Sequence, residues 1–183
     1  AMTTFEFVSV LLSLVVSLAL AHVLTGMARM LVAKDMKFSF VLLGWMGVAL
    51  FDCIDLWFSL WAARDTTVWS LGYVLLWLTA AIAIYLFAWV VVPEGKLDGV
   101  DLRAYHYENR RKFLPLAASY LVVGFVINAT VAQFQSLVSF EAVIFYIPII
   151  VAGVWPNRWA QFGAVALIWI LLIRYAVQFL GMM

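Results

Sequence analysis

The sequence predicts an all-α integral membrane protein: a six-helix transmembrane bundle with both termini outside and a short cytoplasmic amphipathic helix between the third and fourth spans. Its composition gives the class, because 67% of the 183 residues are hydrophobic and only 11% are charged, whereas soluble domains carry about 25% charged residues. Apolar segments also recur along the whole chain, at lengths near the ~20 residues that cross a hydrocarbon core. We expect one transmembrane domain over residues 1–183.

The expected spans cover residues 4–33, 38–63, 68–92, 113–135, 140–155 and 159–180. The first segment is too long for a cleaved signal and has no basic region before it, so we expect it to remain a membrane helix. Pro93 ends the third segment, and Pro156-Asn157 make a tight turn before the sixth. The fifth segment is the shortest and contains Pro148, which predicts a kinked helix, or one that starts earlier than residue 140.

The longest loop, residues 93–112, opens with turn residues and continues into a helix with Asp101 as its N-cap. Tyrosines among basic residues favour a helix lying at the lipid headgroups. Either it is a connector held by anionic lipid or it is an arm that docks a partner. We expect His106 in this loop to be a surface histidine. Nucleic-acid binding is not expected, because acidic residues are mixed with the basic ones.

Basic residues gather at one side of the predicted bundle. Those near the ends of spans one, three and five are Arg29, Lys34, Lys37, Lys96, Arg103, Arg110, Arg111, Lys112 and Arg158. Only Arg64 and Arg174 fall on the other side. Because Lys and Arg are enriched in cytoplasmic loops, the basic side is predicted to be cytoplasmic and both termini to lie outside.

Two carboxylates, Asp52 and Asp55, lie in the middle of the second span. Residues three apart share one helix face. A charge at this depth costs several kcal/mol on insertion scales and needs a partner, a proton or a water-filled cavity. Gly44 and Ser59 fall on the same face, within about 80°. The organising feature of the sequence is this pair.

Spans four and six each have one small and polar face as well. In span four the face holds Ala117, Tyr120, Gly124, Asn128 and Gln135. In span six it holds Ala160, Gly163, Arg174, Gln178 and Gly181. Such faces pack against protein or line a cavity. Spans three and five have none, so we expect them at the periphery or at a subunit contact.

Span one carries two polar faces at different depths. Glu6 and three serines mark its outer half, whereas His22, Thr25 and Arg29 mark its inner half on a face turned by well over 100°. A helix with polar faces on two sides is expected to have protein or water on both. Span one is therefore predicted to be central, with Glu6 and Arg29 as secondary site residues.

Five polar residues are expected to meet in one layer. At ~1.5 Å per residue from the cytoplasmic ends, His22 lies about 16 Å up, Asp52 about 22 Å, Asn128 about 24 Å, and Asp55 and Arg174 roughly 25 Å. The predicted pairs are Asp55 with Arg174, and Asp52 with His22 or Asn128.

Two interpretations of this layer stay open. It is a structural clamp that fixes helix register, or it handles protons or a small cation, because intramembrane carboxylates and histidine form relays. The leading hypothesis is a channel or transporter for protons or a small cation, with Asp52 as the main carrier. The alternative is a non-transporting membrane protein that binds a lipid or hydrophobic ligand, or scaffolds a partner, through Trp-rich faces.

No enzyme chemistry is expected. Intramembrane aspartyl proteases place one Asp on each of two helices, whereas Asp52 and Asp55 share one span. The D-x-x-D motif also opens the metal site of CDP-alcohol phosphotransferases, but here Leu56 follows Asp55 and no second acidic pair lies in a span. No metal-ligand spacing or phosphate-binding loop appears. The single cysteine, Cys53, excludes a disulfide within the chain. We expect no cofactor and no metal.

Segments 18–31 (LALAHVLTGMARML) and 101–107 (DLRAYHY) resemble small bacterial inner-membrane proteins to which no activity is attached. The resemblance implies a bacterial cytoplasmic membrane and nothing about mechanism. The lipid bilayer is the expected partner. A homo-oligomer is expected too, because so small a bundle has little interior of its own and its small-residue faces can serve as subunit contacts.

Overall fold

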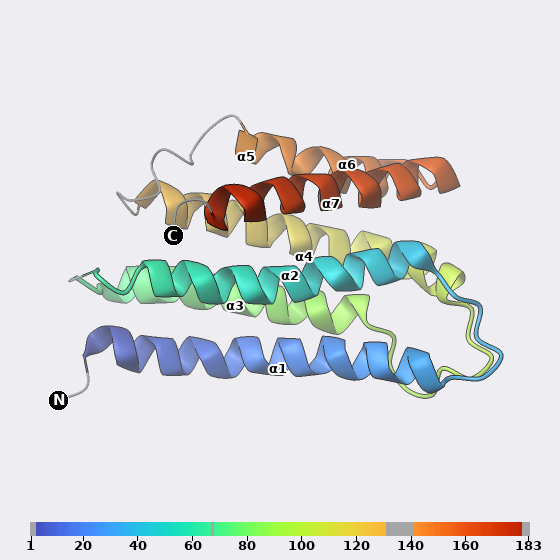
Figure 1. The fold of residues 1–183 in the computed structure, drawn as a ribbon, viewed down its shortest axis with the longest axis horizontal. Coiled ribbons are helices and arrows are strands. Elements are labelled where there is room, and N and C mark those ends of the chain that lie inside the picture. The colour runs from blue at the N-terminus through green and yellow to red at the C-terminus, as the bar shows by residue number, and fades with distance from the viewer. Residues whose placement is uncertain (1–2, 67, 131–140, 181–183) are drawn as a thin grey trace.

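The computed structural model describes residues 3–66, 68–130 and 141–180, and its elements there are helices. In chain order they are α1 Thr4–Val32, α2 Phe40–Ala62, α3 Leu71–Val91, α4 Leu102–Thr130, α5 Glu141–Ile144, α6 Tyr146–Val154 and α7 Arg158–Leu180. The long helices run along the longest axis of the molecule (Figure 1). α1 begins and α7 ends toward the same end of the bundle, on the left of Figure 1.

Among the described residues, five helices are long and apolar enough to cross a membrane: α1, α2, α3, α4 and α7. They indicate an integral membrane protein. The prediction of six spans is not confirmed, because the segment expected over residues 140–155 contains two short helices that meet at Phe145. α6 has nine residues, or roughly 13 Å at 1.5 Å per residue. Pro148 lies in its first turn, where proline is tolerated, so the helix breaks before the proline instead of kinking at it.

Each long helix begins after a residue whose side-chain oxygen accepts a backbone N–H of the first turn, as N-caps do. These residues are Thr3, Ser39, Ser70, Asp101 and Asn157. Asp101 Oδ1 accepts from the amides of Arg103 and Ala104, at 2.9 and 3.1 Å. The predicted N-cap at Asp101 is confirmed.

The separate cytoplasmic helix between spans three and four is a wrong prediction. Leu102 begins one continuous helix of 29 residues, α4, which passes through Pro115. Its first turns pack against protein on one face, because Leu102, His106 and Arg110 are all buried. The basic residues of this segment predicted a separate helix at the lipid headgroups. They do not interrupt α4, because the opposite face of its first turns is covered by protein.

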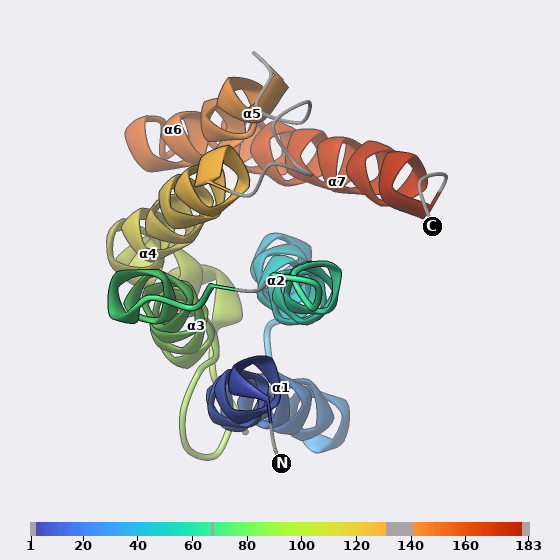
Figure 2. The ribbon, with the colours of Figure 1, turned by 90° about the vertical axis from the view of Figure 1, so that its left-hand side faces the viewer.

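The predicted order of the helices from centre to periphery is also wrong. α3 packs against α1, α2 and α4, and its side chains Trp77, Ile84 and Phe87 are fully buried. α1 packs against α2 and α3 and lies at the edge of the bundle in end view (Figure 2). The polar residues of α1 do not require protein or water beside them, because a serine hydroxyl can donate to a carbonyl of its own helix. Ser9 Oγ donates to Glu6 O in this way.

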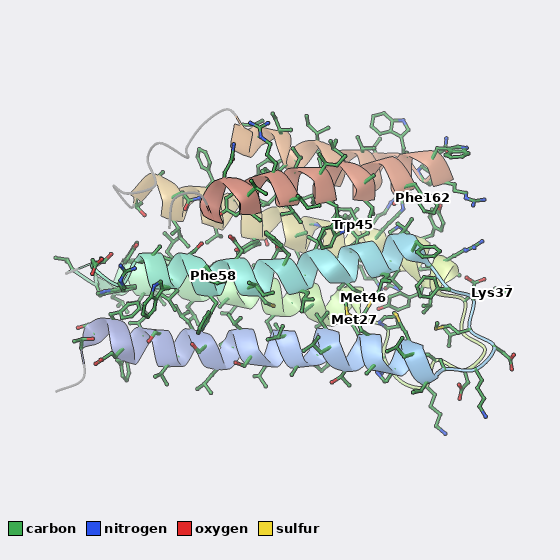
Figure 3. The ribbon with its side chains drawn as sticks, in the orientation of Figure 1. Met27, Lys37, Trp45, Met46, Phe58 and Phe162 are labelled. Atoms are coloured by element: carbon green, nitrogen blue, oxygen red, sulfur yellow. The ribbon has the colours of Figure 1, made fainter. Side chains whose placement is uncertain are left out.

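α2 separates the two halves of the bundle. Met46 points toward Met27 of α1, and Trp45 lies on the opposite side of α2 (Figure 3), where its ring is 5.9 Å from that of Phe113 in α4. α7 docks on α2 through a glycine: Trp169 Nε1 donates to Gly44 O at 3.1 Å. Glycine permits so close an approach between membrane helices.

Candidate functional site

A cavity of about 150 Å³ lies between α2, α4, α7 and the α5–α6 segment. A water molecule needs roughly 10–15 Å³ by this measure, so the space holds on the order of ten waters or a small ligand. Its polar lining comprises Asp52, Asp55, Tyr120, Asn128, Arg174, Tyr175 and Gln178. We call it the carboxylate cavity. Four of the five predicted layer residues line it: Asp52, Asp55, Asn128 and Arg174.

The two carboxylates of the cavity differ in their surroundings. Asp55 accepts a hydrogen bond of 2.8 Å from Tyr120 Oη. Asp52 is 5% exposed, and none of the hydrogen bonds or ion pairs among the described residues ends on its carboxyl group. Asp52 lines the cavity, so it is the carboxylate there whose capacity for hydrogen bonds is not used by the described residues.

Tyr120 is the site residue that the sequence did not single out. It lies one turn before Gly124 and two turns before Asn128, and all three line the cavity. Three of the five residues predicted to share a face of span four thus line the cavity, and Gln135 lies outside the described residues. The hydrogen bond from Tyr120 to Asp55 was not predicted. The predicted Asp55–Arg174 pair stays a prediction; both side chains line the cavity.

His22 is not brought to the cavity. Its ring stacks on Trp89 of α3, with centroids 4.4 Å apart and planes at 12°. Its Nε2 is buried and has no hydrogen-bond partner among the described residues. The predicted contact between His22 and Asp52 fails because α1 lies at the edge of the bundle, whereas the cavity lies on the other side of α2.

The two secondary residues predicted on span one have local contacts. Glu6 completes a capping box at the start of α1, since its carboxylate accepts from Thr3 N at 2.6 Å. Arg29 donates to the carbonyls of Pro93 and Gly95, both at 2.9 Å, in the loop after α3. These bonds fasten the ends of helices.

A second polar group lies toward the other end of α4, and we call it the His106 cluster: His106, Arg110 and Gln161, each at most 4% exposed. His106 Nε2 lies 2.8 Å from Gln161 Oε1. Gln161 Nε2 donates to the carbonyls of Ala152 and Trp155, at 2.8 and 2.6 Å. His106 is thus buried, and the prediction of a surface histidine is wrong.

Arg110 completes the cluster at the C-terminus of α6. Its guanidinium donates to Ala152 O and, at 2.9 Å, to Gly153 O. The last carbonyls of a helix have no partner within it and carry partial negative charge, so a cation there is favourable. The signal in the sequence was the spacing of Leu102, His106 and Arg110, which places a histidine and an arginine on one apolar face.

No group of three or more His, Cys, Asp or Glu side chains is arranged to hold a metal ion in the part of the chain that the structure describes. Comparison with protein-family models, curated proteins and solved structures gives no match.

Proposed function

We propose that the protein is a transporter or channel for protons or a small cation, and that Asp52 and Asp55 carry the charge through the carboxylate cavity. The observation that supports this most is the Asp52 carboxyl, which lines the cavity with no hydrogen-bond partner among the described residues. A structural clamp would use that bonding capacity within the protein. Asn128 and Gln178 add polar lining, and Arg174 is the counter-charge.

The distribution of Lys and Arg between the two ends of the bundle supports an orientation of the protein in the membrane. The end of the bundle with most of the Lys and Arg is cytoplasmic by the positive-inside rule, so α1 begins and α7 ends outside, in a bacterial cytoplasmic membrane. Asn128 and Gln178 lie near the ends of α4 and α7 that face outward. The cavity belongs to the outer half, and the packed rings of Trp45 and Phe113 with the His106 cluster close the inner half. Alternating access opens one side at a time.

We also propose that copies of the chain associate. α7 exposes Ile170, Ile173 and Val177 at 58–64% each, and the exposed face of this helix suits a neighbouring copy as well as lipid.

The second candidate is binding of a lipid or hydrophobic ligand without transport. It is favoured by the apolar part of the same cavity wall, which includes Phe51, Leu121, Phe125 and Phe145. Ligand pockets are mostly apolar with a few polar groups that fix orientation. In this case Tyr120 and Asp55 would orient the ligand.

The deciding experiment measures proton and cation flux into liposomes that contain the purified protein, with Asp52→Asn beside the wild type. We expect the flux of Asp52→Asn to fall at least about tenfold, because the amide cannot release a proton or neutralise a cation. Its thermal unfolding should hardly change, since no hydrogen bond or ion pair among the described residues ends on the Asp52 carboxyl group. Asp65→Asn is the matched control, because Asp65 is 67% exposed and pairs only with Arg64 nearby.

Two results contradict the transport proposal. One is an absence of flux from the wild type under either polarity. The other is equal flux from Asp52→Asn and the wild type. Saturable binding of a hydrophobic fluorophore that Phe125→Ala weakens, together with absent flux, would favour the ligand-binding candidate.

A further inference from the structure

A second pocket, of about 130 Å³, lies at the basic end of the bundle. The residues around it come from the starts of three helices: Ser39 and Phe40 at α2, Arg103 and Tyr107 in the first turns of α4, and Arg158 at α7. We call it the arginine pocket. It is separate from the carboxylate cavity, and no residue lines both.

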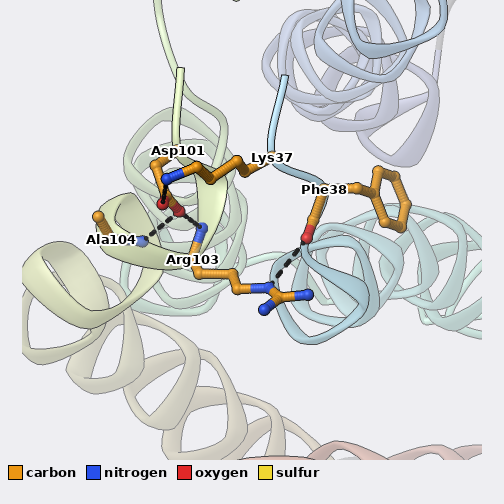
Figure 4. A network of polar contacts seen from close by, with 5 residues as sticks. All are labelled: Lys37, Phe38, Asp101, Arg103 and Ala104. Carbon is orange, nitrogen blue, oxygen red and sulfur yellow. Dashed lines mark hydrogen bonds and ion pairs between the residues drawn. The ribbon is translucent and has the colours of Figure 1, made fainter. Parts of the chain in front are cut away.

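The charge of the arginine pocket is positive. Two arginines and no acidic residue line it. Arg103 Nε donates to Phe38 O at 3.3 Å, and its terminal nitrogens have no acceptor among the described residues (Figure 4). Arg158 lies over the ring of Phe162, 5.9 Å from its centroid. Both guanidinium groups therefore keep donors for an anion.

Lys37, which lies nearby, is already paired within the protein. Lys37 forms an ion pair with Asp101 at 3.2 Å. Backbone hydrogen bonds from Lys37 N to Val100 O and from Leu102 N to Lys37 O join the two segments. This pairing neutralises the closest carboxylate (Figure 4). The starts of α2 and α7 add the partial positive charge of two helix N-termini, where anions bind, whereas the start of α4 is already capped by the Asp101 carboxylate.

A buried group without a partner points to a ligand independently of the charges. His106 lines the arginine pocket and is 1% exposed, and its Nδ1 has no hydrogen-bond partner among the described residues. Because Gln161 Nε2 donates to two carbonyls, Gln161 Oε1 must accept from His106 Nε2–H. Nδ1 is therefore an unprotonated acceptor, left for a ligand group that can donate a hydrogen bond, and buried nitrogens are rarely left unbonded.

We propose that the arginine pocket binds the phosphate group of an anionic phospholipid headgroup, with Arg103 and Arg158 donating to its oxygens and His106 Nδ1 accepting a hydrogen bond from a hydroxyl of the same headgroup. Phosphate is the anion that guanidinium groups match best. Phe40, at 70% exposed, and Phe162, at 39%, flank the pocket with apolar surface. That surface suits the glycerol and upper acyl chains of a lipid, which a soluble phosphate lacks.

The test titrates the delipidated protein in detergent with three probes: dioctanoyl phosphatidylglycerol, dioctanoylglycerol and inorganic phosphate. The first two have the same chains and differ in the phosphate headgroup. We expect phosphatidylglycerol to bind at least tenfold more tightly than dioctanoylglycerol. Arg158→Gln and Arg103→Gln should each weaken phosphatidylglycerol roughly tenfold, the scale of one charge-assisted hydrogen bond, and leave dioctanoylglycerol unchanged.

Arg111→Gln is the matched control, because Arg111 is exposed on the same helix and does not line the pocket. It should bind phosphatidylglycerol as the wild type does. Equal affinity for the two lipids, or an equal loss in Arg111→Gln and Arg158→Gln, overturns the proposal. Inorganic phosphate bound as tightly as phosphatidylglycerol would overturn the lipid as source and assign the pocket to a soluble phosphate. Liposome flux tests the carboxylate cavity separately, so either proposal can fail alone.

Discussion

The His106 cluster and the carboxylate cavity are polar groups built on the same helix, α4, and they differ in how completely their hydrogen bonds are made. In the cluster, Arg110 and Gln161 together make four bonds to the carbonyls at the end of α6. In the cavity, Asp55 has Tyr120, but Asp52 has no partner among the described residues. Buried polar groups that are satisfied within the protein fix one arrangement of the chain. Groups that keep unused bonding capacity are available for a ligand or a proton.

The two groups also differ in how much empty space lies beside their side chains. The side chains of the His106 cluster are at most 4% exposed, and its atoms bond across α4, α6 and α7. The carboxylate cavity leaves about 150 Å³ between the same helices and α2. We therefore expect the bonds of Arg110 and Gln161 to contribute to stability, although His106 Nδ1 lacks a partner among the described residues, and we propose solute handling for the carboxylate cavity.

The largest effect on stability is expected from Arg110→Met, with Arg111→Met as its control. Each removes one positive charge from the same helix. Arg110→Met removes the donor to Gly153 O and one of the two donors to Ala152 O, which keeps the bond from Gln161 Nε2, so we expect a loss of about 2–4 kcal/mol in the free energy of unfolding. Arg111 is exposed, and its variant should stay within about 0.5 kcal/mol of the wild type. Unfolding by denaturant in bicelles, followed by tryptophan fluorescence, measures both. Equal losses would mean that net charge, and not the bonds to α6, is what matters.

The next effect concerns the contact that holds α7 beside the cavity. A methyl group at Gly44 would overlap Val165 Cγ1, so Gly44→Ala should cost about 1–3 kcal/mol. Adding Val165→Ala makes room for the methyl group, and the double variant should recover much of that loss as a coupling between the two sites. Gly163→Ala is the control on α7, because nothing lies within 4 Å of a Cβ there, and it should stabilise the helix by up to about 1 kcal/mol. Additive effects of Gly44→Ala and Val165→Ala would show that the helices are not in this contact.

Part of this molecule can be predicted from local chemistry. Helix periodicity placed Asp52 and Asp55 on one face of α2, and Tyr120, Gly124 and Asn128 on one face of α4, and all five line the same cavity. The N-cap at Asp101 follows from its side chain alone. Such predictions need only the geometry of one helix.

The packing order of the helices and the contacts between distant segments depend on which helices are neighbours. Helix periodicity does not predict this. α3 has no polar face, yet it packs against α1, α2 and α4, because in a membrane apolar side chains fill protein interiors as well as they face lipid. His22 and Asp52 have similar predicted depths but lie on opposite sides of α2. Gln161 and His106 are 55 residues apart, and neither shows from its own segment that the other will be its partner. The fifth predicted span, residues 140–155, is not confirmed for a different reason, because length and hydropathy do not show where a helix will break.

The smallest effect is expected from Asp101→Asn, a change in hydrogen-exchange protection. Asp101 is a solvent-accessible carboxylate that can be compared with the buried Asp52. Its pKa is lowered, first by the hydrogen bond from the Ala104 amide and also by Lys37 and the Arg103 amide. A carboxylate with a lowered folded pKa contributes stability above its unfolded pKa of about 3.9, and this contribution is lost as the pH falls through the folded pKa. Asp101→Asn keeps an N-cap oxygen but loses the charge. The wild type should therefore protect the Arg103 and Ala104 amides from hydrogen exchange better than Asp101→Asn at about pH 6, and this difference should vanish once Asp101 is protonated. A difference that grows on acidification would contradict the assignment of partners at Asp101. It would also weaken the comparison with Asp52, which rests on Asp101 being the carboxylate whose charge is fully partnered.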